Sequence, residues 1–267
     1  MSAIDDVFRA LRAQGRKAFM PFVTAGDPDL EFTALVLAEI MRRGANLCEL
    51  GIPYSDPIAD GPVIQASYTR ALERHVKLAQ IFDTVRKAQP QLSAPVASMV
   101  SYAIVLRHGP AAYVRDAKQA GMSGMIVPDL PADESEELSR ICRGEDFSLV
   151  QLVAPTTPRE RTLRIAATST GFLYYVSVTG ITGERTALPQ ELIDNLRWLR
   201  GETDLPICVG FGISTPEHVR TLAPVADGLI VGSAVVRRVA EAGARPRDQV
   251  LAEIGNYVAE LVDALGS

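Results

Sequence analysis

The sequence predicts a closed (β/α)8 barrel, or TIM barrel, with one extra helix at the N-terminus. Short apolar segments alternate with segments of helical periodicity along the whole chain, which favours parallel strands joined by crossover helices. Eight such units fit within 267 residues, a size typical of a closed barrel. Acidic and glycine-rich loops follow several of the apolar segments, and the active sites of such barrels form from these loops.

The eight predicted strands are short apolar runs, each followed by a loop. They cover residues 18–23, 45–51, 94–100, 123–127, 148–153, 171–177, 206–210 and 227–231. An open doubly wound sheet is the alternative, but no strand is followed by a G-x-G-x-x-G segment that opens a helix. The sequence contains no low-complexity linker, so we expect a single domain over residues 1–267.

The predicted helices lie between these strands and have one apolar face each. They cover residues 30–44, 78–89, 110–120, 133–143, 158–167, 189–199, 216–223 and, after the last strand, 248–265. Several begin with residues that favour helix starts, for example Thr215 followed by Pro216.

The first residues predict an amphipathic helix that precedes the barrel. Apolar side chains recur there at helical spacing, at Ile4, Phe8 and Leu11, and Ser2 and Asp5 have the spacing of a capping box. The segment lacks the basic start and the long apolar core of a signal peptide. We therefore expect a helix that covers the bottom of the barrel.

Composition and charge argue against several classes of function. The net charge is -5 and no lysine or arginine cluster is present, which disfavours nucleic acid or an anionic membrane as the main partner. No apolar run approaches the roughly 18 residues of a membrane span. The three cysteines are scattered and odd in number, which suits a reducing cytoplasm without disulfides. Neither these cysteines nor the three histidines have the spacing of metal ligands, so no metal is expected.

The segment ELGIPYSDPIADGPVIQ, residues 49–65, is the strongest candidate for a catalytic site. Glu49 lies near the end of a predicted strand, where a carboxyl is costly without a partner or a function. If Cys48 and Leu50 are buried under the helices, alternation directs Glu49 to the mouth of the barrel. The following proline-rich loop carries Asp60, so two acids can face one pocket. The alternatives are an ion pair of Glu49 that braces the barrel, and a stiff surface turn with solvated acids.

Glycine-rich loops follow the last three strands, at residues 179–183, 210–214 and 232–234. In this fold, backbone N–H groups of the seventh and eighth loops and a helix N-terminus bind phosphate, and glycine permits the close approach. Almost no lysine or arginine lies in these loops, so backbone amides and the partial charge of a helix are expected to neutralise the anion. Phe22 and Tyr174, at strand ends, either line an apolar pocket between the phosphate and the acids or belong to the core.

Four motifs together resemble the tryptophan synthase α subunit family. They are PFVTAGDP at residues 21–28, ELGIPYSDP at 49–57, ADGPVIQ at 59–65 and GFGI at 210–213, and the resemblance extends over nearly the whole chain. It implies a lyase of tryptophan biosynthesis that cleaves indole-3-glycerol phosphate to indole and glyceraldehyde 3-phosphate in a retro-aldol reaction. It also implies no cofactor in this chain and a heterotetramer of two α and two β subunits in which indole passes to a pyridoxal-phosphate β subunit, and the cysteines favour a cytoplasmic location.

The resemblance also implies roles for individual residues. The two catalytic acids fall on Glu49 and Asp60. The substrate contacts fall on Phe22 and Tyr174 for the indole ring, Thr182 in a lid, and Gly183, Gly212, Gly232 and Ser233 for the phosphate. Retro-aldol cleavage needs one proton placed on the indole ring carbon and one removed from a glycerol hydroxyl. We expect an ionised Asp60 beside the ring nitrogen and a Glu49 of raised pKa that transfers both protons.

Two positions depart from the family pattern. Ile104-Val105 replaces an Asn-Pro pair in a loop that usually touches the β subunit, and Val178 replaces an arginine found in some members at the start of the lid. The sequence therefore does not determine whether the chain contacts a β subunit through this loop or how the lid closes. Two other functions remain possible: another phosphate-binding barrel enzyme, such as a sugar-phosphate isomerase, and a non-catalytic activator of a β subunit.

Overall fold

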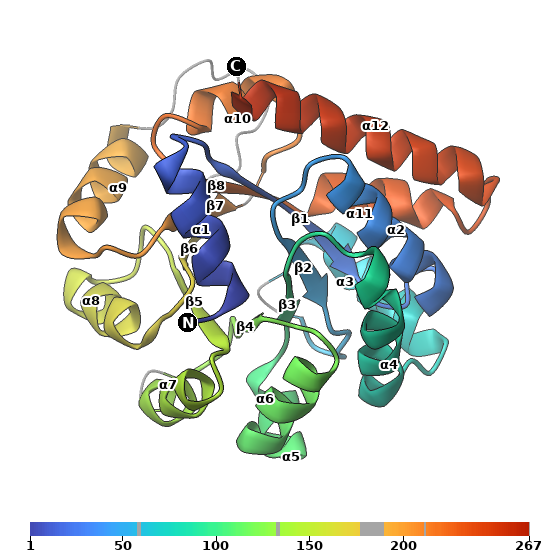
Figure 1. Cartoon of the computed structure of the whole chain (residues 1–267), viewed down its shortest axis with the longest axis horizontal. Helices are drawn as coiled ribbons and strands as arrows, with labels where there is room; N and C mark the ends of the chain where they lie inside the picture. Colours follow the sequence, from blue (N-terminus) through green and yellow to red (C-terminus); the bar gives the residue numbers. More distant parts are fainter. Residues whose placement is uncertain (58–59, 132–133, 177–189, 211, 267) are drawn as a thin grey trace.

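The structure, a computed structural model, describes residues 1–57, 60–131, 134–176, 190–210 and 212–266. Within these residues, eight parallel strands form a closed barrel in chain order, because the first strand also pairs with the eighth (Figure 1). They are β1 (Ala18–Thr24), β2 (Cys48–Gly51), β3 (Val96–Met99), β4 (Gly124–Ile126), β5 (Ser148–Val153), β6 (Leu173–Val176), β7 (Ile207–Gly210) and β8 (Gly228–Val231). The predicted fold class is confirmed, and the open doubly wound sheet is excluded.

The helices surround the barrel and cover one of its ends. They are α1 (Ala3–Ala13), α2 (Leu30–Arg42), α3 (Pro62–Glu73), α4 (Leu78–Ala88), α5 (Tyr102–His108), α6 (Pro110–Gln119), α7 (Ser135–Gly144), α8 (Arg159–Thr168), α9 (Gln190–Glu202), α10 (Pro216–Leu222), α11 (Ser233–Glu241) and α12 (Arg247–Gly266), with a short 3-10 helix at Gln89–Gln91. Each predicted helix is present in its described part.

Three helices, α3, α5 and α11, were not expected from the sequence. The proline-rich loop after β2 ends at Gly61, because Pro62, which the sequence placed in the loop, opens α3. Proline suits the first position of a helix, where the N–H that it lacks would have no partner within the helix. The turn residues before α3 and α11 obscured the helical periodicity behind them.

Apolar side chains pack on both faces of the sheet, toward the helices and toward the lumen of the barrel. Alternation along β2 places Cys48 and Leu50 in the layer between the sheet and the helices, whereas Leu47 packs in the lumen. The same alternation along β1 places Met20 and Phe22 in the lumen. Since a shift by one residue would exchange the two layers, burial on both sides fixes which side chains enter the barrel.

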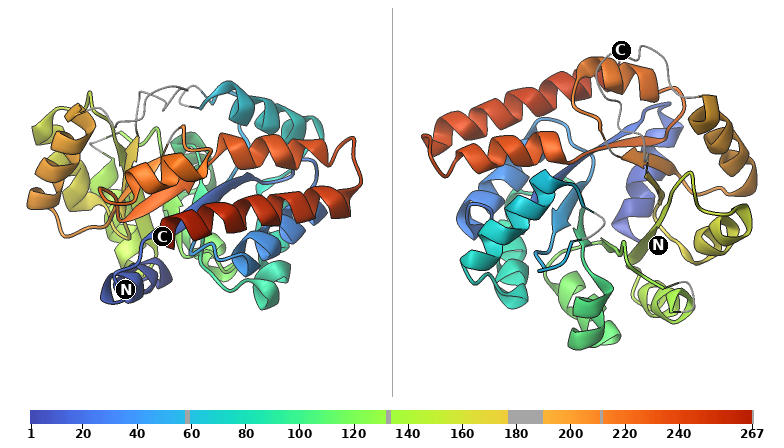
Figure 2. Two further views of the ribbon diagram at one scale, coloured as in Figure 1. Left: turned by 90° about the horizontal axis from the view of Figure 1, so that it is seen from above. Right: turned by 180° about the vertical axis from the view of Figure 1, so that it is seen from behind.

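Helix α1 closes the N-terminal end of the barrel, as predicted. Ile4 and Phe8 are buried in the cluster that fills the lumen, and the ring centroids of Phe8 and Phe172 are 5.6 Å apart. Ser2 and Asp5 form the expected capping box. The left view of Figure 2 shows α1 below the barrel and α3 above it. The loops at the opposite end from α1 therefore remain to build a site.

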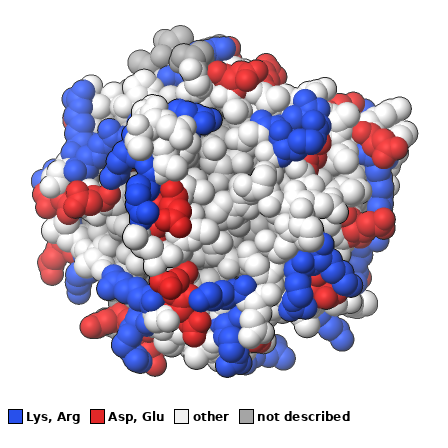
Figure 3. All heavy atoms as spheres, viewed as in Figure 1, with Lys and Arg blue, Asp and Glu red and all other residues white. Residues whose placement is uncertain are grey.

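The surface is of mixed charge. Figure 3 shows acidic and basic side chains interspersed over the face that carries α1. No helix in the described part of the chain has the length and apolar character needed to cross a bilayer. Cys48, Cys142 and Cys208 are buried and unpaired, and the described residues contain no group of three or more His, Cys, Asp or Glu side chains that could hold a metal ion.

Candidate active site at the C-terminal end of the barrel

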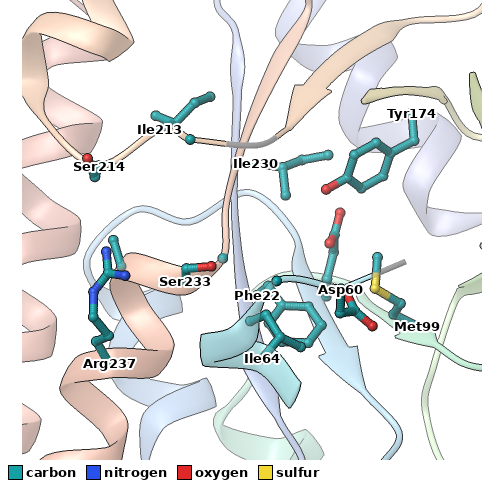
Figure 4. Close-up of a pocket in the computed structure, with 15 residues that line it drawn as sticks. Phe22, Asp60, Ile64, Met99, Tyr174, Ile213, Ser214, Ile230, Ser233 and Arg237 are labelled. Atoms are coloured by element: carbon teal, nitrogen blue, oxygen red, sulfur yellow. The ribbon is translucent and has the colours of Figure 1, made fainter. Parts of the chain in front are cut away.

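A cavity of about 280 Å³ lies at the C-terminal end of the barrel (Figure 4). It brings together side chains from strands and loops that are far apart in the sequence. Seven residues that the sequence singled out line it: Phe22, Glu49, Asp60, Tyr174, Gly212, Gly232 and Ser233. Thr182 and Gly183, the other two, lie outside the described residues, as does Val178.

Glu49 is completely buried on β2. Its register neighbours on the adjacent strands are Phe22 and Ala97. Neither carboxyl oxygen has a hydrogen-bond partner among the described residues, so no ion pair there braces the barrel through Glu49. Burial, and to a lesser extent the charge of Asp60, raises the pKa of Glu49 well above its ordinary value. This raised pKa agrees with the expectation from the sequence, and a carboxyl of raised pKa is suited to give and take protons.

Asp60 lies just before α3, with its side chain toward the same cavity. The Gln65 side chain donates a hydrogen bond to the Asp60 carbonyl oxygen at 2.8 Å, and the Tyr54 hydroxyl donates to Asp60 Oδ2 at 3.5 Å. Burial raises the pKa of Asp60 to about 6, although the hydrogen bond from Tyr54 opposes the rise. Asp60 is thus mostly ionised at pH 7. Asp56 of the same loop is exposed and does not line the cavity.

Contacts of α3 hold the Asp60 loop against the barrel. The hydroxyls of Thr24 and Ser67 are 2.6 Å apart, which ties α3 to the end of β1. The Arg70 guanidinium binds both carboxylate oxygens of the buried Asp27, at 2.8 and 2.7 Å. Because Asp60 is two residues from the start of α3, these contacts restrict where its carboxylate can lie.

Glycines at two strand ends make room for the aromatic side chains. A β-carbon on Gly51 would lie 2.4 Å from Phe22 Cζ, and one on Gly210 would lie 2.3 Å from Tyr174 Oη. Burial raises the pKa of Tyr174, so its hydroxyl stays neutral and can donate a hydrogen bond. Both rings line the cavity, and both also belong to the apolar cluster that fills the lumen.

The glycine-rich loops form the other side of the cavity. Gly232 caps α11 and Ser233 is its first residue, so N–H groups of the first helical turn, which have no acceptor within the helix, lie at the cavity. Gly212 has a φ of 75°, a left-handed conformation that favours glycine. Backbone donors at a helix start, with no side chain in front of them, suit an anion such as a phosphate.

Sequence reasoning missed four side chains that line the cavity: Ile64, Met99, Ile230 and Arg237. Met99 and Ile230 have the pattern of ordinary core residues, whereas Ile64 lies within the ADGPVIQ motif, from which no role was assigned to it. Arg237 lies on α11, for which no helix was expected. Its spacing of four residues from Ser233, which puts both on one helix face, was the signal that could have identified it.

Comparisons with known proteins agree with the fold and the motifs. The family profile described as tryptophan synthase alpha chain matches residues 8–265. The tryptophan synthase alpha chains of Rhodopirellula baltica and Rippkaea orientalis are 55% and 45% identical to this chain, over 99% of it and over 99% and 98% of their own lengths. Tryptophan synthase subunit alpha from Legionella pneumophila has a TM-score of 0.90 at 33% identity, with 100% of this chain and 99% of that one covered. Tryptophan synthase from M. tuberculosis in an aminoacrylate-bound form has a TM-score of 0.87 at 27% identity, over 99% and 100% of the two chains.

Proposed function

The chain belongs to the tryptophan synthase alpha chain family, and we propose that Glu49 and Asp60 carry out the reaction of this family in the cavity described above. The reaction is the cleavage of indole-3-glycerol phosphate to indole and glyceraldehyde 3-phosphate, so the protein is a lyase of tryptophan biosynthesis. One observation carries the proposal: a completely buried carboxyl of raised pKa, without a partner among the described residues, shares a cavity with a second carboxyl whose pKa is about 6. Two acids whose environments separate their pKa values suit one proton-transfer group and one fixed anion.

Glu49 transfers two protons in succession. Its protonated carboxyl donates to the indole ring carbon that bears the glycerol chain, which leaves a positive charge spread toward the ring nitrogen. The resulting carboxylate accepts the proton of the hydroxyl on the attached carbon. The carbon–carbon bond then breaks, its electron pair returns to the ring, and the chain carbon becomes the aldehyde. Glu49 is protonated again at the end, so the cycle needs no other proton source.

Asp60 stabilises the positive charge that develops on the ring. As a carboxylate it accepts a hydrogen bond from the ring N–H, and this bond becomes stronger as the nitrogen gains positive charge. Phe22 and Tyr174 provide apolar walls for the ring and keep water from Glu49. The phosphate lies at Gly212, Gly232 and Ser233, and the family resemblance adds Gly183 to this site and Thr182 to a lid.

The proposed partner is a β subunit, which receives the indole within a heterotetramer of two α and two β subunits. The proposed location is the cytoplasm. We propose that the whole chain is one barrel domain that needs no cofactor of its own. In support of one domain, α1 packs on the lumen and α12 packs along α2, α10 and α11 (Figure 1). Ile104 and Val105, where the family commonly has Asn-Pro, lie within α5, with Val105 buried.

The decisive experiment measures indole release from indole-3-glycerol phosphate by the purified chain, with and without a β subunit. We expect release by the wild type and by Asp56→Asn, which removes an exposed carboxylate of the same loop. A chain that stimulated a β subunit but released no indole in either condition would instead be the non-catalytic activator. A sugar-phosphate isomerase would have no use for the pair of acids, and no observation favours it.

A further inference from the structure

Arg237 gives the cavity a charge asymmetry. Among the described residues that line the cavity, it is the single cationic side chain, whereas Glu49 and Asp60 are the acidic ones. Figure 4 shows Arg237 on the same side as Ser233 and Ser214, away from Asp60 and Tyr174. The cationic end of the cavity therefore coincides with the helix start that offers backbone donors, and the acidic end lies opposite.

The Arg237 guanidinium has no hydrogen bond or ion pair to any residue that the structure describes. Two other arginines, one on α11 and one in the loop between α11 and α12, have partners. Arg238 donates to the Ala234 carbonyl oxygen at 2.8 Å and lies 3.5 Å from the centre of the Tyr257 ring, and Arg245 pairs with Glu241 and Glu253. Arg237 thus keeps its donors available at the cavity while its neighbour on the helix stabilises the packing of α11 on α12.

A helix start alone leaves a phosphate dianion poorly neutralised. A phosphate monoester carries about -1.5 to -2 charges at pH 7, whereas a helix N-terminus supplies a partial charge of only about +0.5. The ionised Asp60 at the other end of the cavity adds unfavourable potential for an anion. A guanidinium offers a full positive charge and a planar set of donors that matches phosphate oxygens.

Resting on the proposed function, we propose that Arg237 binds the phosphate of indole-3-glycerol phosphate and acts as a specificity and orientation residue. Attraction to Arg237 at one end and repulsion by Asp60 at the other favour the pose in which the indole ring, and not the phosphate, meets the two acids. The sequence led us to expect that backbone amides neutralise the phosphate without a cationic side chain. In this proposal Arg237 shares that role, because α11 brings it to the same site from outside the glycine-rich loop.

The test compares Arg237→Gln, Arg237→Lys and the control Arg220→Gln, which removes the same charge from the exposed face of α10. Calorimetric titration with glycerol 3-phosphate gives binding without chemistry. We expect the dissociation constant to rise about tenfold in Arg237→Gln, two- to threefold in Arg237→Lys, and not in the control. The loss should shrink at high salt, because screening weakens the interaction of an exposed guanidinium. The KM for indole-3-glycerol phosphate should follow the dissociation constant, while kcat changes less than about twofold.

Two results would overturn the proposal: an affinity of folded Arg237→Gln within twofold of wild type, or no binding of glycerol 3-phosphate to the wild type. Failure of the proposed function has a different signature. In that case the wild type and Arg220→Gln release no indole although they bind glycerol 3-phosphate, and the titration still decides the role of Arg237 as a phosphate ligand.

Discussion

The hydroxyl of Tyr174 on β6 lies against the end of β7, where a β-carbon on Gly210 would be only 2.3 Å from Tyr174 Oη. Real β-carbons do not approach an oxygen so closely, and the ring atoms Cε1 and Cζ would also be 2.7 Å away. Tyr174 is buried and cannot swing into solvent. The missing side chain of Gly210 therefore determines where one wall of the cavity lies.

Gly210→Ala should displace the Tyr174 ring and narrow the cavity. Overpacking of this kind costs about 1–3 kcal/mol, so we expect the melting temperature to fall by several degrees and the KM for indole-3-glycerol phosphate to rise about tenfold. Thermal denaturation and indole-release kinetics measure the two effects. Adding Tyr174→Phe should restore part of the loss, because it removes the closest contact. An unchanged KM and melting temperature in Gly210→Ala would show that the ring yields freely.

Glu49→Gln tests the proton-transfer role with almost no change of shape. The neutral amide has almost the same shape as a buried carboxyl whose charged form burial disfavours, so circular dichroism and the melting temperature should change little. Turnover should fall about 10²- to 10⁴-fold, the usual contribution of a positioned acid–base group. If the folded variant kept more than about a third of wild-type indole release, Glu49 would not be the proton-transfer residue. Asp56→Asn serves as the matched control.

The pH dependence of kcat/KM should have an acidic limb set by Asp60. Its pKa is about 6, so activity should rise through that pH as the carboxylate forms, and fall at higher pH where Glu49 loses its proton. In Tyr54→Phe the hydrogen bond that lowers the pKa of Asp60 is absent, and the acidic limb should move to higher pH. The shift should be small, because a 3.5 Å hydrogen bond is weak. A limb that stayed in place or moved to lower pH would contradict the assignment.

Stability should change with pH in the same range. The folded state raises the pKa of Asp60 from 3.8 to about 6, so it binds a proton more tightly than the unfolded state does. The stability from this proton is fully present below about pH 4 and is lost as the pH rises through about 6. Asp60→Asn should therefore be more stable than wild type at pH 8 by about 2 kcal/mol, and the gap should close near pH 4. Urea denaturation at the two pH values measures this difference, and a gap independent of pH would refute the coupling.

Gly232→Val tests the phosphate site with little risk to the fold. A β-carbon on Gly232 would lie 3.8 Å from Phe22 Cβ and 4.0 Å from Ile64 Cδ1, so the protein tolerates it, but the side chain would enter the cavity. Loss of one or two charge-assisted hydrogen bonds, at about 1.5–3 kcal/mol each, should raise the KM at least tenfold. Ser233→Ala should cost less, since one hydroxyl contact disappears while the amides remain.

Glycerol 3-phosphate binding to these variants provides the check. Unchanged calorimetric affinity in folded Gly232→Val would place the phosphate elsewhere. Gly212→Val is a poorer test, because a φ of 75° strains any residue with a β-carbon and a loss of binding would then have two causes.

Local patterns in the sequence determined the strands, the side of the sheet that the residues of β2 face, and the helix below the barrel. Alternation and helical spacing are properties of neighbouring residues, so they can be read without knowing the rest of the fold. For the same reason Glu49 was assigned to the lumen from its neighbours Cys48 and Leu50 alone. The residues of the cavity were proposed because strand ends of a barrel meet at one face.

The tertiary structure decided what depends on distant contacts. Closure of β1 on β8 brings Phe22 to Gly232, and the packing of α11 brings Arg237 to the cavity. The sequence suggested only that Asp60 is ionised, whereas the structure raises its pKa to about 6. This rise results from burial by several elements at once. Burial and the electrostatic potential sum over everything nearby in space, and most of those neighbours are remote in the chain.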